Sequence, residues 1–166
     1  MSRQQKSKMP KFVVHEHHAS HLHFDFRIEM EGVLKSWAVP KGPSMNPKDK
    51  RLAIMVDDHT LEYGSYEGII PEGNYGAGAV LIWDSGEYGY LGGNIRMGRL
   101  EFSLKGKRLK GIFILARMSG KEKEWLLMKK RDEFAEDNFQ MKTMLTPSLL
   151  KKLKTQTPPC DASWDS

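Results

Sequence analysis

The sequence predicts a mainly β protein, a compact closed or nearly closed β-barrel with few short helices. Apolar and polar residues alternate from Leu22 to Glu29, which is the period of a β-strand. Short apolar runs separated by turn residues then continue through most of the chain, as in small closed sheets. Segments with a helical period are scarce, and 166 residues suffice for one substantial core.

The first half of the chain is predicted to form three strands. Alternation and turn residues mark their limits. The expected elements are a mobile basic arm (1–10), an ordered start at Phe12, a hairpin of strands 22–29 and 33–39 turning at Glu31-Gly32, a proline-rich loop (40–47) and a strand from Arg51.

The second half is predicted to complete the barrel, so that residues 11–154 form a single domain. Residues 64–78 hold five glycines and form a structured loop, either a simple connection or a wall over the site. The later elements are a strand at 79–84, a glycine-rich span (86–98), a hairpin of 100–104 and 111–118, a strand at 124–131, a short helix over Ser148–Lys154 capped by Thr146 whose leucines pack on the barrel, and a disordered tail (155–166).

The strand from Leu22 carries an unusual polar face. Its apolar set can enter a core while His23, Asp25 and Arg27 stand in a row on the other side. Such a face is often merely solvated, but then lysine, glutamate, threonine and serine are usual, whereas imidazoles and carboxylates bind Mn, Fe or Zn. His17 could supply a third ligand from the preceding turn.

Other residues leave this site open to alternatives. Three more histidines compete for the ligand role, and a histidine-rich tract can bind metal without specificity; they are His15, His18 and His21. If the strand from Arg51 lies beside the first, Arg51 and His59 face the same side as the polar row.

Composition bounds the partners and the compartment. The net charge of +5 and the pI of about 9.2 allow a polyanionic partner but do not require one. Cys160 is the one cysteine, so an internal disulfide is excluded and a reducing compartment fits. The sequence has no apolar run of membrane-span length and no signal peptide, so we expect a cytoplasmic protein without a membrane partner.

Five segments in order resemble the 3′-phosphoesterase family, the domain at the amino end of bacterial DNA ligase D that also occurs as free-standing proteins. They are HHASHLHFDFRIE, LKSWAVPKGPS, residues 51–63, EGIIPEGNYGAG and VLIWDSGEY, within a match from about Phe12 to Asp132. The resemblance implies a compact β-barrel enzyme that uses Mn²⁺. Such enzymes remove a 3′-terminal ribonucleoside and then the 3′-phosphate from DNA, which leaves a 3′-hydroxyl.

The resemblance also implies roles for individual residues. The metal ligands fall on His17, His23 and Asp25. The phosphate contacts fall on Arg27, Lys41, Arg51 and His15, the last at a position where many relatives have glutamine. The catalytic group comprises His59, Tyr63 and Arg27, with Asp57 as the family's nearby acidic residue. The arm before the barrel is shorter than in longer relatives, which have an extra acidic and basic segment there. The resemblance therefore implies phosphate removal more directly than ribonucleoside removal.

The chemistry of these residue types agrees with such a site. A divalent ion stabilises charge on a phosphate and lowers the pKa of bound water, arginine and lysine share the remaining charge, and His59 is a candidate general acid with an ordinary pKa of about 6.5. Zn²⁺ or Co²⁺ would also suit the ligands. The expected partners are DNA 3′ ends in a primer-template or nicked duplex, followed by a DNA ligase or polymerase.

Two other functions fit the same residues. One is a noncatalytic module that binds DNA ends for a repair complex, which predicts phosphate-dependent binding without turnover. The other is a 2-His-1-carboxylate Fe(II) oxygenase, which would leave Arg27, Lys41 and Arg51 with little purpose. A metal-supplemented end-processing assay separates them.

Overall fold

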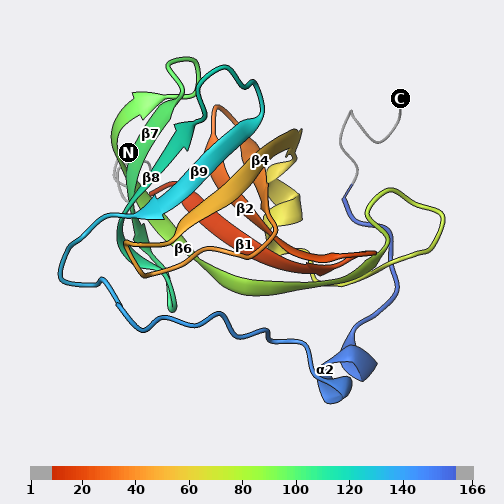
Figure 1. Cartoon of the computed structure of the whole chain (residues 1–166). Helices are drawn as coiled ribbons and strands as arrows, with labels where there is room; N and C mark the ends of the chain where they lie inside the picture. The colour runs from red at the N-terminus through yellow and green to blue at the C-terminus, as the bar shows by residue number, and fades with distance from the viewer. Residues whose placement is uncertain (1–8, 160–166) are drawn as a thin grey trace, which may run out of the picture.

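A computed structural model describes residues 9–159 of the chain (Figure 1). This part is built almost entirely from antiparallel strands. They are β1 (Lys11–His18), β2 (Leu22–Met30), β3 (Val33–Val39), β4 (Lys50–His59), β5 (Gly68–Ile70), β6 (Gly78–Asn94), β7 (Arg99–Lys105), β8 (Lys110–Arg117) and β9 (Glu124–Lys129). The described helices are a 3-10 helix, η1 (Leu61–Ser65), and an α-helix, α2 (Pro147–Lys152).

The sheet closes on itself as a barrel. The strand order is β1-β2-β3-β4-β9-β8-β7-β6, and β1 pairs with β6 to complete the ring (Figure 1). The short strand β5 adds to the outer end of β6, where Gly68 pairs with Val80. Closure removes the unpaired strand edges that an open sheet would expose. The predicted fold class, a closed β-barrel with few short helices, is confirmed.

The barrel interior is an aromatic core fed by alternate residues of each strand. Phe24, Phe26 and Ile28 of β2 are all buried in it, as the alternation predicted. Phe26 stacks on Phe102 with ring centroids 5.6 Å apart, and each buried side chain of this size stabilises the fold by roughly 1.5–3 kcal/mol. With this core occupying the inside, the polar row of β2 must lie on the outside of the barrel.

A second, smaller cluster lies outside the barrel and covers part of that outer face. It contains Leu34, Tyr63, Tyr66, Ile70 and Val80. These residues come from β3, η1, β5, β6 and the link between η1 and β5. The chain from residue 63 to 70 is therefore packed against the barrel wall by its own apolar contacts.

Two elements differ from the sequence prediction. β1 already runs through His15 and His17, so His17 projects from a strand and not from a turn. β6 continues through the glycine-rich span as far as Asn94. Position 86 of this strand requires glycine, because a Cβ there would sit 2.2 Å from the carbonyl oxygen of Lys105.

After β9 the chain runs along the outside of the barrel as an extended segment, residues 130–159 (Figure 1). α2 lies within it, and the Thr146 hydroxyl accepts a hydrogen bond from the Leu149 amide as the expected cap. Leu150 is 42% exposed, so its predicted packing on the barrel is wrong, whereas Leu149 and Leu153 are half-buried.

The two predicted flexible ends fall only partly within the described residues. Pro10 accepts a backbone hydrogen bond from Tyr88, and the Gln156 amide donates to the carbonyl oxygen of Ile69. Residues 1–8 of the expected arm and 160–166 of the expected tail lie outside the described part. In residues 9–159 no helix is long and apolar enough to cross a membrane.

Candidate active site

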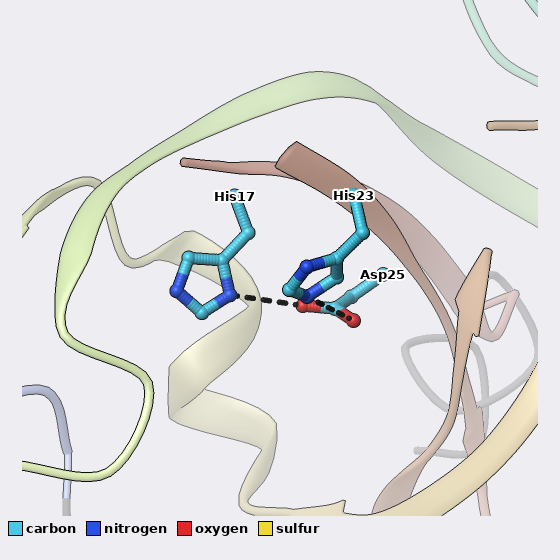
Figure 2. A group of neighbouring side chains, drawn as sticks. All are labelled: His17, His23 and Asp25. Carbon is cyan, nitrogen blue, oxygen red and sulfur yellow. Dashed lines mark hydrogen bonds and ion pairs between the residues drawn. The ribbon is translucent and has the colours of Figure 1, made fainter. Parts of the chain in front are cut away.

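The candidate site lies on the outer face of β1 and β2. The antiparallel register places His17 opposite His23 and His15 opposite Asp25, and residues opposite one another share a face of the sheet. One ligand atom from each of His17, His23 and Asp25 lies within 4.8 Å of the others. Figure 2 shows the contacts that run from both imidazole rings to the oxygens of the Asp25 carboxylate.

Backbone carbonyls fix the orientation of both imidazoles. Nε2 of His17 donates to the carbonyl oxygen of Gly76 at 2.7 Å, and Nδ1 of His23 donates to that of His21 at 3.2 Å. A carbonyl accepts only, so these nitrogens hold the hydrogen in the neutral rings. Nδ1 of His17 and Nε2 of His23 then face the Asp25 carboxylate at 3.4 and 3.2 Å. In a neutral ring each of them offers its lone pair to a cation, and in a protonated ring each donates a hydrogen bond to the carboxylate. The hydrogen bonds to the carbonyls are the usual outer support of metal-binding histidines.

Asp25 stays ionised although it is 5% exposed. Burial acts to raise the pKa of its carboxyl, but the Arg27 guanidinium and the hydrogen bonds of His17 and His23 outweigh burial and hold the pKa well below its usual value. The carboxylate acts on His23 in turn. Burial acts to lower the pKa of His23, but the hydrogen bond and the charge of Asp25 outweigh burial, so the pKa of His23 is raised above its ordinary value. A carboxylate that attracts a proton to His23 also attracts a metal cation.

Arg27 is the buried cation beside this cluster, 2% exposed. Its Nη2 donates to Asp25 at 3.0 Å, its Nε to Nδ1 of His15 at 3.0 Å, and its Nη1 to the Ser36 hydroxyl at 3.0 Å. Nη1 also lies 3.1 Å from Nδ1 of His59. Among the described residues, four of the five guanidinium N–H groups have a partner, and the second Nη2 hydrogen is the donor available to a bound anion.

His15 is held as a neutral support of Arg27. Its Nε2 donates to the carbonyl oxygen of Tyr66 at 3.1 Å, so its Nδ1 accepts from Arg27. Complete burial and the adjacent Arg27 charge lower the pKa of His15 well below its ordinary value. His15 thus contacts the guanidinium from behind, and it is absent from the described residues that line the pocket.

His59 reaches the site because β4 is irregular. Ser36 pairs with Val56 and Leu34 with His59, so β4 carries one more residue than β3 over this stretch. This bulge turns His59 to the same face as Val56, although their positions in the sequence have opposite parity. His59 then faces Arg27, as the sequence analysis expected, but by a route that alternation does not predict.

Tyr63 contacts the side chains of His59, His15 and Arg27. Its ring stacks on His59 with centroids 4.6 Å apart and lies 5.0 Å from the ring of His15. The Arg27 guanidinium lies 4.7 Å from the centre of the Tyr63 ring. Because Tyr63 is 2% exposed and also stacks on Tyr66, it fixes these groups in place.

The site opens into a pocket of about 730 Å³. Its floor is the outer face of the barrel, and the loop at residues 71–77 forms a wall. The described lining residues are His17, Ala19, His23, Asp25, Arg27, Ala38, Val56, Asp57, His59, Tyr63, Ile70, Gly73, Asn74, Tyr75 and Gly76. Of the two alternatives for the glycine-rich loop, a simple connection or a wall over the site, residues 73–76 form the wall.

Lys41 and Arg51 do not occur among the described residues that line this pocket. Lys41 is exposed in the turn after β3. Arg51 pairs with Leu127, so it points to the core side of the sheet and not to the face of Asp25, contrary to the expected parity. Its Nη2 lies 3.4 Å from Asp49. Roles for Lys41 and Arg51 at the phosphate remain predictions.

Sequence reasoning missed three residues that support the site. Ser36 bonds Arg27, the Tyr66 carbonyl sets the ring of His15, and the Gly76 carbonyl sets the ring of His17. Two of these act through backbone oxygens, which every residue type has, so the sequence carries no signal for them. Tyr66 and Gly76 both lie in the glycine-rich loop at residues 64–78, but the sequence did not indicate which of its carbonyls would face the site.

The donor set fits a divalent transition ion. Two lone-pair nitrogens and one ionised carboxylate suit Mn²⁺, Fe²⁺, Co²⁺ or Zn²⁺, and the pocket beside them has room for further ligands. Arg27 places a permanent positive charge next to that position. Fold and site together define a closed β-barrel protein with a candidate metal centre beside a buried arginine.

Comparison with known proteins identifies the family. Residues 15–117 match the model of the DNA ligase D 3′-phosphoesterase domain, and the chain belongs to this family. It is 45% identical to the multifunctional non-homologous end joining protein LigD of Pseudomonas aeruginosa over 135 residues, 78% of this chain and 16% of the relative. It is 38% identical to the LigD protein of the same description from Mycobacterium bovis over 160 residues, 93% of this chain and 21% of the relative. The chain thus spans about a sixth to a fifth of the length of these relatives.

Proposed function

We propose that the chain is a Mn²⁺-dependent phosphoesterase that processes the 3′ ends of DNA. It would remove a 3′-terminal ribonucleoside by phosphodiester cleavage and then the 3′-phosphate, which leaves a 3′-hydroxyl. The observation that supports this most directly is the shared carboxylate, since Asp25 joins two imidazoles to Arg27 in one pocket. A metal ion and a phosphate oxygen would therefore meet at adjacent positions.

His17, His23 and Asp25 would hold the ion, which when bound supplies Lewis-acid charge stabilisation and activates a water molecule. Arg27 donates its remaining Nη2 hydrogen to a nonbridging phosphate oxygen and balances the charge that builds there. The single available donor makes Arg27 a fixed charge held in position by its neighbours. Arg27 thus makes one hydrogen bond to the phosphate and not a bidentate pair.

His59 would act on the leaving 3′ oxygen. Arg27 can only donate, so Nδ1 of His59 accepts from it and the neutral ring holds its proton on Nε2. We propose that Nε2 donates toward the leaving oxygen, and that Tyr63 keeps the ring in this orientation by stacking. Lys41 and Arg51 are proposed to contact phosphates of the strand from outside the pocket.

The proposed substrates are 3′ ends in a primer-template or nicked duplex. The relatives named above act in non-homologous end joining, where a 3′-hydroxyl end serves a DNA polymerase or ligase. We propose that this chain supplies such ends.

A panel of metals and substrates tests the proposal. Mn²⁺, Co²⁺, Zn²⁺, Mg²⁺ and Fe²⁺ are each combined with DNA that ends in a 3′-phosphate or in a single 3′-ribonucleotide. We expect phosphate release with Mn²⁺, ribonucleoside removal before it, and loss of both in Asp25→Ala. Binding of the phosphorylated end without turnover under every metal would contradict the proposal and favour a noncatalytic end-binding module.

A further inference from the structure

The pocket is larger than its catalytic chemistry requires. Its volume of about 730 Å³ is in the range of sites that hold whole small molecules, whereas an ion and one phosphate group fill only the floor near Asp25. The wall at residues 73–76 stands over this floor. The pocket therefore leaves room beside that wall for the group attached to the phosphate.

Tyr75 is the exposed aromatic of the described pocket lining. Tyr75 is 78% exposed, whereas Tyr63 on the pocket floor is 2% exposed. In Figure 1 the segment that carries Tyr75 is the yellow-green excursion beyond the ends of β1 and β2. A planar ring at this place meets a substrate before the buried groups do.

The backbone of the wall is held in a defined shape. Asn74 donates from its backbone and from its side chain to the carbonyl of Pro71, and Ala77 donates to the carbonyl of Asn74. Gly73 and Gly76 adopt φ of 90° and 76°, which other residues rarely adopt. The ring of Tyr75 therefore projects from a shaped turn and not from an extended loop.

The wall is also tied to the metal-ligand cluster. The Gly76 carbonyl, one residue after Tyr75, accepts the hydrogen bond from His17 at 2.7 Å. A Cβ on Gly76 would lie 3.3 Å from the His17 ring, so the two are in close contact. The position of Tyr75 is thereby linked to the position where the phosphate would bind.

We propose that Tyr75 stacks on the base of the 3′-terminal nucleoside and holds the end of the strand over the phosphate site. This inference rests on the proposed function and names the part of the substrate that the wall recognises. Bases of every kind have a flat face, so an exposed tyrosine ring binds an end without selecting its sequence. Tyr75 is accordingly a positioning residue that acts on substrate affinity more than on the chemical step.

Equilibrium binding tests the proposal apart from turnover. The probe is a fluorescent oligonucleotide with a 3′-phosphate, compared with the same strand whose last nucleoside lacks its base, in the presence of EDTA. We expect the wild type to bind the complete end about 5- to 150-fold more tightly than the abasic end. Tyr75→Ala should remove most of this ratio, and Tyr75→Phe should keep it.

Tyr90→Ala is the matched control, because Tyr90 is 59% exposed on β6 and is absent from the described pocket lining. It should bind both ends as the wild type does. The stacking role would be overturned if wild type and Tyr75→Ala preferred the complete end over the abasic end to the same degree. It would also be overturned if the wild type bound both ends equally tightly. A Tyr75-dependent ratio without phosphate release under any metal would retain the stacking role and reject the phosphoesterase proposal.

Discussion

At the scale of single residues, the site depends on polar groups that are buried and hydrogen-bonded to one another. Asp25, Arg27 and His15 are each at most 5% exposed, and each hydrogen-bonds to another of the three or to a neighbouring backbone carbonyl. An unpaired buried charge costs several kcal/mol, so removal of one member destabilises the rest. Their arrangement keeps a carboxylate ionised between two imidazoles, which is the state that binds a cation.

His23 on β2 and His21 in the turn before it offer a paired test of the ligand set. We expect His23→Ala to weaken Mn²⁺ binding by more than the roughly 10- to 100-fold that loss of an outer-shell partner costs, because it removes a lone-pair nitrogen from the cluster. His21→Ala should leave binding unchanged, since His21 is exposed and holds His23 through its backbone carbonyl. Calorimetric titration with Mn²⁺ measures both. Equal losses in the two variants would indicate nonspecific binding by the tract.

At the scale of elements, irregular pairing and a local cover shape the pocket. The bulge in β4 turns His59 toward Arg27. The segment from η1 to β5 then packs on the same outer face and brings Tyr63 over both. A regular, uncovered strand would expose these groups to water, where charge interactions are far weaker.

The end of β9 offers a second paired test. The Lys129 ammonium is fully buried and donates to Asp132 at 2.6 Å, and Asp132 also accepts from the amides of Ile112 and Phe134. Asp132→Ala should lower the free energy of unfolding by about 3–5 kcal/mol at pH 7, because it strands a buried ammonium. The exposed pair of Arg131 and Asp137 is the control, and Asp137→Ala should change stability little.

The pH dependence of this pair has a definite sign. Burial acts to raise the pKa of Asp132, but the Lys129 hydrogen bond and the two amides lower it below 3.8. The contribution of Asp132 is therefore fully present above its unfolded pKa and is lost as the pH falls through the lower folded pKa. Urea unfolding from pH 7 to pH 3 should show wild type and Asp132→Ala converging at the acid end. A constant difference would mean that Asp132 acts without its charge.

At the scale of the whole molecule, residues 130–159 tie the barrel to the cover of the site. The buried Glu16 carboxylate on β1 accepts from the amides of Met144 and Leu145 at 2.6 and 3.0 Å. Further along, Ile69 of β5 donates to the carbonyl of Lys154 at 2.9 Å. The segment thus holds β1 beside His17 at one point and the cover at another.

Glu16→Gln tests this connection with little change in volume. One amide hydrogen-bond donor would then face the backbone donors, so we expect a loss of about 1–3 kcal/mol in stability. Hydrogen exchange at Met144 and Leu145 should accelerate. Glu122 is exposed, so Glu122→Gln is the control. In this variant the amides of Met144 and Leu145 should exchange as they do in the wild type. Unchanged protection at both amides would mean that the segment is held by its other contacts alone.

Alternation in the sequence was sufficient to predict a barrel, the burial of Phe24 and Phe26, and the outward row of His23, Asp25 and Arg27, because side-chain direction in a strand is a local property. Alternation could not place Arg51 or explain His59, since the face of β4 depends on its register with β3 and on the bulge between them. Nor could it predict that the Gly76 carbonyl orients His17, or that Glu16 binds a segment more than a hundred residues away. Those contacts join parts of the chain that are distant in sequence, and only the closed sheet brings them within hydrogen-bonding distance.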